Sequence, residues 1–313
     1  LIALWIYGVH RPSGEFFRWV EEAFAALPLG DHERAAELYG IDALGAWVRD
    51  DLQRCLRSCQ AAFDAETQRG TGVTVPARIA IVMAASYAPT ADPRLVPITS
   101  DAPRRFLELV AWAREVGDPY WLSYTMATGA NGMNIAGDHE RAAALAERAL
   151  DQARRSGCLS QIAWSLESLG FALEYADPPR AEALLEESVR TARGVRSDLV
   201  LGVSLALLAT LRRRLGRPLD AMPLHVELLD HWDRLDVVPQ MWHTLREAAM
   251  CLGMVGIDDP AVRILTAVEQ AEMVMPESAV DRAQVDSVMD DLHVRLGAAA
   301  FADARSAGTG LTR

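Results

Sequence analysis

The stretch GDHERAAALAERAL, residues 137–150, decides how this chain folds. A glycine and an aspartate mark a turn, and Ala142, Ala146 and Ala149 follow at positions i, i+4 and i+7. That spacing places all three side chains on one stripe of an α-helix, where small residues let a neighbouring helix approach closely. Such a triplet of small or apolar residues occurs seven times: Phe16, Val20, Ala23; Cys55, Cys59, Ala62; Ala102, Phe106, Leu109; Ala142, Ala146, Ala149; Ala181, Leu185, Ser188; Ala221, His225, Leu228; and Ala261, Leu265, Val268.

The first members of these triplets recur along the chain at a nearly constant step of roughly 40 residues. A period held over six steps predicts a repeat protein in which each unit is a pair of antiparallel helices. The turns agree with this prediction, since Gly137-Asp138 precedes the fourth triplet and Gly216-Arg217-Pro218 precedes the sixth. Glycine ends the first helix of a pair, and aspartate or proline starts the second.

We therefore predict an all-α fold, a right-handed superhelix of about seven helical hairpins. This solenoid is expected to cover residues 1–275, and C-terminal capping helices with a tail cover 276–313, with the helices near 278–296 and 298–306. Because a solenoid grows by contacts between neighbours, both parts are expected to form a single continuous domain. The longest step, from Cys55 to Ala102, contains an insertion, and its proline-rich segment 88–103 is predicted to be a surface loop.

Charge and composition exclude several functions. The formal net charge of −12 opposes binding to nucleic acid and to anionic lipid. No apolar run approaches the ~20 residues of a membrane-spanning helix, and no signal peptide is recognisable. All 31 basic residues are arginine, so a phosphate-binding loop with its lysine and a Schiff-base lysine are both excluded. The four cysteines indicate the cytoplasm, because they do not form a disulfide framework.

Cys55 and Cys59 stand one helical turn apart and could hold a metal if two further ligands converged on them. Both, however, belong to a packing triplet, which favours a role as small core residues. The histidines show no metal-ligand spacing, and His225 is itself a triplet residue. We predict no metal, no cofactor and no catalytic residue.

Three stretches, residues 137–150, 169–188 and 215–228, resemble tetratricopeptide repeats, with Leu-Gly near the end of the first helix and small residues on the second. The longer unit of about 40 residues is similar to the C-terminal sensor region of actinobacterial regulators, the LuxR-type and cyclase-linked ATPase regulators. In that group a nucleotide-binding switch domain precedes the repeats. The resemblance implies a sensor that acts on attached domains. Neither an ATPase loop nor a helix-turn-helix is recognisable, and Leu1 reads as the middle of a helix, so we expect a fragment of a longer protein.

In tetratricopeptide arrays the first helices line a concave face, and the resemblance places a mixed set of aromatic, amide and charged residues there. The asparagines attract most interest, because an asparagine within a helix does little for helix stability but pairs well with an extended chain. Trp164 and Phe171 are aromatic residues of a kind that is more often core than ligand-binding, and a short charge run before a turn, such as Arg212, Arg213 and Arg214, is usually a solvated helix end. The candidate ligand-binding residues are Tyr124, Asn131, Asn134, Trp164, Glu167, Phe171, Arg213, His243 and Arg246, with Glu174 and Thr210 in the same phase.

The function expected from these observations is non-catalytic: a peptide, a protein or a small effector binds the concave face, and the change passes to the attached domains of a larger signalling or transcriptional regulator. A self-associating scaffold module, such as a homodimer, is one alternative, since exposed solenoid ends stack. A helical enzyme without a recognisable motif is the other.

Overall fold

The fold is all-α throughout the part of the chain that the computed structural model describes, residues 5–10, 14–26, 32–49, 51–85, 99–271 and 279–311. The predicted all-α class is therefore confirmed. The contacts divide the chain into an N-terminal unit, Leu1–Ser204, and a C-terminal unit, Leu205–Arg313, and the division falls within α12. The helices are α1 (Trp5–His10), α2 (Gly14–Ala26), α3 (Ala35–Val48), α4 (Leu52–Arg69), α5 (Val75–Ala85), α7 (Ala102–Val116), α8 (Pro119–Ile135), α9 (His139–Ser156), α10 (Leu159–Leu173), α11 (Pro178–Val195), α12 (Asp198–Arg214), α13 (Pro218–Leu235), α14 (Val238–Met254), α15 (Asp258–Gln270), α16 (Ala279–Leu296) and α17 (Ala298–Gly308).

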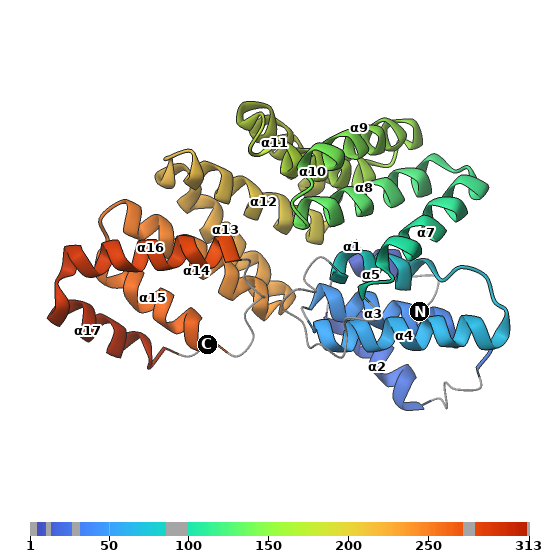
Figure 1. The fold of residues 1–313 in the computed structure, drawn as a ribbon, viewed down its shortest axis with the longest axis horizontal. Helices are drawn as coiled ribbons and strands as arrows, with labels where there is room; N and C mark the ends of the chain where they lie inside the picture. Colours follow the sequence, from blue (N-terminus) through green and yellow to red (C-terminus); the bar gives the residue numbers. More distant parts are fainter. Residues whose placement is uncertain are drawn as a thin grey trace. The chain divides into compact units, whose positions relative to one another are not determined.

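Helical hairpins follow one another along the chain, as the period predicted. Figure 1 shows α8 beside α9 and α10 beside α11, and α10 also packs against α8 and α9 of the preceding hairpin. In the first part of the chain α3 packs against both α4 and α5, and in the C-terminal unit α14 packs against α13 and α15. The helices α16 and α17 lie where capping helices were predicted. Packing of consecutive hairpins is compatible with a tetratricopeptide-like solenoid, which stays a prediction, as does a single continuous domain.

Short local signals set the ends of the helices. The carboxylates of Asp138 and Asp177 accept hydrogen bonds from the backbone N–H groups three residues later and so cap α9 and α11. Gly157 ends α9 with a φ of +68°, in the left-handed region that favours glycine. Arg196 and Asp236 occupy the same left-handed position at the ends of α11 and α13, so the repeat imposes this conformation on residues other than glycine.

The triplet stripes form the contacts between helices. Every triplet residue is buried except Ala23 and Phe106, which are half-buried. The helices approach so closely that a Cβ atom added at Gly170 would lie 2.8 Å from Cγ of Leu185 in the fifth triplet. His225 is buried within its triplet, as an interface histidine. The predicted phase of the packing stripe is therefore right.

Two sequence predictions remain, one about the loop at 88–103 and one about membrane-spanning helices. Most of the segment 88–103, predicted to be a surface loop, lies outside the described residues, and α7 begins at Ala102. Among the helices described here, none is both long and apolar enough to cross a membrane.

Candidate functional site

The helices α8 and α10 bring together the aromatic candidates of the N-terminal unit. Tyr124 of α8 and Trp164 of α10 are buried side by side, with their ring centroids 5.5 Å apart. Two polar atoms of this pair, Oη of Tyr124 and Nε1 of Trp164, are buried and have no hydrogen-bond partner in the part of the chain that the structure describes. Because tyrosine and tryptophan usually find a partner for these groups when buried, the pair is incompletely satisfied in this structure.

The first helix of the described chain lies on this aromatic pair. The Trp5 ring of α1 stacks on Trp121 with centroids 6.1 Å apart and meets Tyr124 edge-on at 6.3 Å. At the other end of α1 the His10 ring meets Trp164 edge-on at 5.8 Å. Its Nδ1 lies 2.8 Å from Oγ of Ser197, and burial lowers the pKa of His10 to about 4. A short helical segment therefore covers the face formed by α8 and α10.

A polar cluster continues the same face along α8 and α10. Nδ2 of Asn131 donates to Oε2 of Glu167 at 3.0 Å, and Nδ2 of Asn134 donates to the backbone oxygen of Ser168 at 3.1 Å. Burial raises the pKa of Glu167 to about 7, although the hydrogen bonds from Asn131 and Ser168 lower it. The Oδ1 atoms of both asparagines are buried and accept no hydrogen bond. The amides and the carboxylate predicted from the sequence thus meet in one cluster.

The candidates Arg213, His243 and Arg246 lie in the C-terminal unit, around a residue that was not predicted from the sequence, Glu247 of α14. Nε of Arg213 donates to Oε2 of Glu247 at 3.0 Å, and Thr210 donates to the same oxygen at 3.3 Å. Burial raises the pKa of Glu247, but the positive charges, first that of Arg213, outweigh burial and leave the pKa below its ordinary value. Nη2 of Arg246 lies 2.8 Å from Nδ1 of His243. Arg213 is therefore a buried, paired residue and not part of a solvated helix end.

The candidate residues thus fall into two clusters in two units, and most of them are more buried than the sequence implied. Tyr124, Asn131, Trp164 and Glu167 are each at most 5% exposed, since the helices of adjacent hairpins pack closely and α1 covers the aromatic pair. Phe171 is half-buried, with its ring centroid 6.3 Å from that of His139. The predicted ligand-binding role of these residues stays a prediction.

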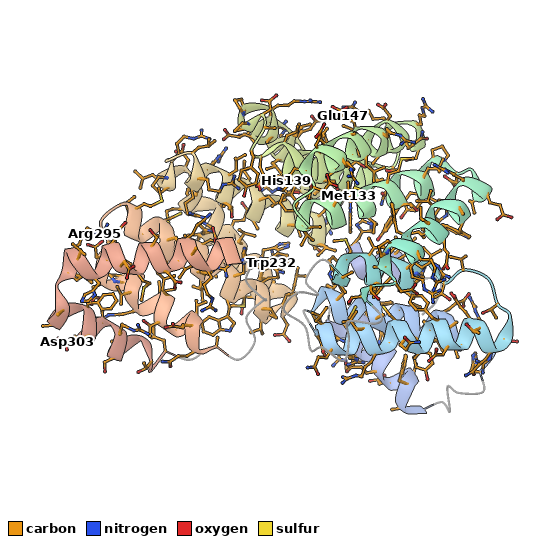
Figure 2. The ribbon with its side chains drawn as sticks, in the orientation of Figure 1. Met133, His139, Glu147, Trp232, Arg295 and Asp303 are labelled. Atoms are coloured by element: carbon orange, nitrogen blue, oxygen red, sulfur yellow. The ribbon has the colours of Figure 1, made fainter. Side chains whose placement is uncertain are left out.

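Arg246 also lines a cleft in the C-terminal unit. The cleft has a volume of about 620 Å³ and lies among residues of α14, α15, α16 and α17. Its apolar lining includes Leu265, Met289 and Phe301, and the ion pair between Arg305 and Glu269, 2.7 Å long, stands at its side. Arg295 lies on α16 (Figure 2). It pairs with Asp258 at 2.8 Å and so ties this helix to the start of α15.

The cysteines occupy packing positions. Cys55 and Cys59 are both fully buried, and across the described ranges no group of histidine, cysteine and carboxylate side chains could hold a metal. Sγ of Cys251 lies 3.7 Å from Nε2 of His225, but burial raises the pKa of this thiol to about 11. A thiol with that pKa stays protonated at neutral pH and is a poor nucleophile.

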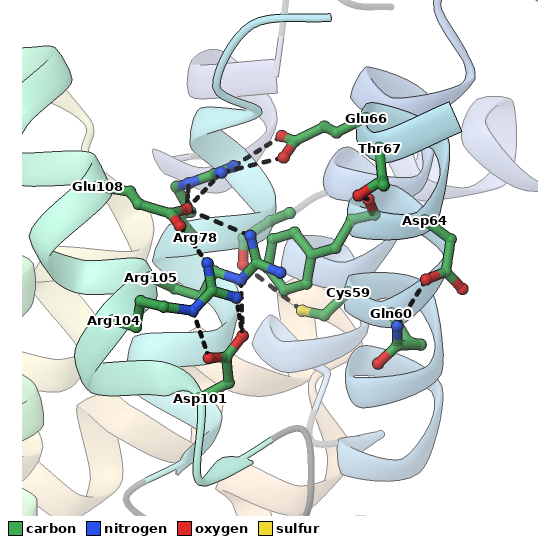
Figure 3. A network of polar contacts seen from close by, with 12 residues as sticks. Cys59, Gln60, Asp64, Glu66, Thr67, Arg78, Asp101, Arg104, Arg105 and Glu108 are labelled. Carbon is green, nitrogen blue, oxygen red and sulfur yellow. Dashed lines mark hydrogen bonds and ion pairs between the residues drawn. The ribbon is translucent and has the colours of Figure 1, made fainter. Parts of the chain in front are cut away.

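An arginine network near the N-terminus was not foreseen from the sequence. Arg78 of α5 is buried and pairs with Glu66 of α4 and with Glu108 of α7, each at 2.6 Å (Figure 3). Arg105 lies over the Phe63 ring, 3.7 Å from its centroid, as a cation–π contact. These contacts join α4, α5 and α7 through arginines and carboxylates that pair with each other, so we interpret the network as structural.

No known family model matches this chain, and no curated protein is significantly similar to it.

Proposed function

We propose that this chain is the non-catalytic, partner-binding repeat region of a larger signalling or transcriptional regulator that acts in the cytoplasm. The binding surface is the face of α8 and α10 in the N-terminal unit, built from Tyr124, Trp164 and the polar cluster around Glu167. A bound peptide, protein or effector alters the packing of the hairpins, and this change reaches the attached domains through the solenoid.

A single observation carries this proposal: the face of α8 and α10 already holds a short helical segment. The six-residue helix α1 lies there through Trp5 and His10, which contact Trp121, Tyr124 and Trp164. Isolated helices of this length are unstable in water, so α1 owes its order to its contacts within the N-terminal unit, which include those with α3 and those with the aromatic side chains of α8 and α10. A surface that orders one aromatic helical segment has the chemistry to bind another segment of the same kind.

A synthetic peptide with the sequence of residues 1–10 tests this reasoning. The substitution Trp5→Ala removes the ring that stacks on Trp121 and should loosen α1 from its surface. We expect the peptide to bind the Trp5→Ala protein saturably and to raise its unfolding midpoint with concentration, and to bind the unsubstituted protein at least tenfold more weakly, because α1 competes.

The matched control is Trp19→Ala, which removes an exposed tryptophan of α2. This variant should bind the peptide as weakly as the unsubstituted protein does. A second control peptide, with alanine in place of Trp5 and His10, should not bind. If the Trp5→Ala protein fails to bind the peptide, or binds both peptides equally, the face does not recognise helical partners and the proposal is wrong.

A further inference from the structure

The polar clusters of the two units occupy equivalent positions in the repeat. Glu167 and Glu247 stand at the same offset before the triplet residues that follow them, Ala181 and Ala261. Both glutamates lie on first helices, α10 and α14, and both are buried. The fold therefore contains the same buried acidic position twice.

The preceding first helix supplies the neighbours of each glutamate, again from equivalent positions. Asn131 and Thr210 stand at one shared offset before the next triplets, and each donates to its glutamate. About one helical turn further along the same helices stand Asn134 in the N-terminal unit and Arg213 in the C-terminal unit. The two clusters thus differ in the residue at this last position, and also in Arg246, whose Nε lies 3.9 Å from Oε1 of Glu247 in the C-terminal unit.

That difference decides the charge of each cluster. In the C-terminal unit the guanidinium of Arg213 pairs with Glu247, and both side chains are 9% exposed. In the N-terminal unit Asn134 brings no charge, and its amide donates to the backbone oxygen of Ser168 instead. Among the described residues, the groups that donate to Glu167 are the neutral side chains of Asn131 and Ser168. The cluster around Glu247 therefore contains its own cations, Arg213 and Arg246, whereas the described neighbours of Glu167 that affect its pKa are neutral.

The cluster around Glu167 also contains acceptors that lack a donor. Oδ1 of Asn131 and Oδ1 of Asn134 are buried, and within the described ranges neither accepts a hydrogen bond. Buried acceptors are costly when they are left unsatisfied, so the chemistry favours an occupant that brings several N–H donors and a positive charge. A guanidinium carries five donors, no acceptor and a permanent charge, and it is the group that the equivalent cluster contains.

We propose that the cluster of Asn131, Asn134 and Glu167 binds an arginine side chain of the partner that docks on α8 and α10. The inference rests on the proposed function and specifies the chemistry of the partner. The guanidinium pairs with Glu167 and donates to the asparagine oxygens, in the role that Arg213 has beside Glu247. Trp164, one turn before Glu167 on α10, lies at the aromatic end of the same face, next to Tyr124. A matching partner therefore carries an arginine near an aromatic residue.

The test uses N-acetyl-arginine methylamide as a probe and the citrulline analogue as a neutral probe of the same shape. We expect the arginine probe to raise the unfolding midpoint of the unsubstituted protein in a concentration-dependent manner, and the citrulline probe to leave it unchanged. Glu167→Gln should weaken binding of the arginine probe at least tenfold, because it removes the negative charge. Asn134→Arg should weaken binding to the same extent, because it places an internal guanidinium beside Glu167 as Arg213 is placed beside Glu247.

Glu147→Gln is the matched control, since Glu147 is an exposed carboxylate of the same unit that pairs with Arg180. This variant should bind the arginine probe as the unsubstituted protein does. The inference is overturned if the arginine probe does not bind, if both probes bind alike, or if Glu167→Gln leaves binding unchanged. The peptide of residues 1–10 contains no arginine. Peptide binding without probe binding would refute this inference alone, and probe binding without peptide binding would refute the proposal of a helical partner.

Discussion

Replacing Glu167 with glutamine should stabilise the protein at alkaline pH. Burial raises the pKa of this carboxyl group to about 7, from an ordinary value of 4.5. The folded state therefore binds a proton more tightly than the unfolded state does. The resulting stability is fully present below pH 4.5 and is lost as the pH rises through 7. Glutamine resembles the protonated carboxyl group and cannot ionise, so Glu167→Gln avoids that loss.

The magnitude follows from the two pKa values. Each pH unit between them corresponds to about 1.4 kcal/mol, so the buried carboxylate costs roughly 3 kcal/mol at pH 8 and about 1 kcal/mol at pH 5. Urea unfolding of both proteins at pH 5 and pH 8 measures this difference. We expect the stability advantage of Glu167→Gln to grow by roughly 2 kcal/mol between the two pH values. Other titrating groups contribute equally to both proteins and cancel in the comparison.

Glu247→Gln provides a control from the equivalent position of the repeat. Glu247 pairs with Arg213, and its pKa lies below the ordinary value. Glutamine would leave the Arg213 guanidinium buried without a counter-charge, which costs about 3–5 kcal/mol. If Glu167→Gln destabilised the protein at pH 8 as Glu247→Gln is expected to, Glu167 would be ionised and paired. The argument from an uncompensated carboxylate would then be wrong.

Four further predictions use other parts of the molecule. Ala181→Trp should overpack the fully buried helix interface and cost about 1–3 kcal/mol or more, whereas Ala183→Trp, on the exposed side of α11, should be nearly neutral in thermal unfolding. Arg78→Met should cost about 3–5 kcal/mol of unfolding free energy by leaving buried Glu66 unpaired, while exposed Arg104→Met should cost less than about 1 kcal/mol. Burial lowers the pKa of His10 from 6.5 to about 4, so the contacts of α1 should weaken as the pH falls from 6.5 to 4. Tryptophan fluorescence should report this weakening, and His10→Gln should abolish the pH dependence of the fluorescence. Residues 1–313 should neither hydrolyse ATP nor retard duplex DNA at physiological salt, and a clear signal in either assay would contradict the assignment.

The all-α class and the burial of the triplet stripes were predictable because they follow from local patterns in the sequence. The triplet stripe, as in Ala142, Ala146 and Ala149, determines which side of each second helix is buried, and the nearly constant period repeats that choice along the chain. The turns carry equally local signals, such as the Asp138 cap and Gly157. The boundary between the two units, which falls inside α12, has no such signal. The spacing of the turns and triplets is the same before and after this helix.

The candidate site was predictable only in part. The position of each residue within its repeat correctly indicated that Asn131 and Glu167 lie close together. Side chains of adjacent first helices meet at fixed positions in the repeat. Phase alone could not show that α1 covers Tyr124 and Trp164, because that contact joins residues more than a hundred positions apart. Glu247 was missed even though it stands two repeats after Glu167, and aligning the units by their triplets would have revealed it.

The placement of α1 has a consequence for the order of events during synthesis. His10 is joined to Ser197, 187 residues later. At about 5–20 residues per second, roughly 10–40 s separate the translation of these two residues. Throughout that interval Trp5 is on the nascent chain before the whole of the docking surface of α1 has been made. Of the described helices, the earliest in the sequence is therefore among the last to reach its final position, and chaperones have a defined interval in which to bind it.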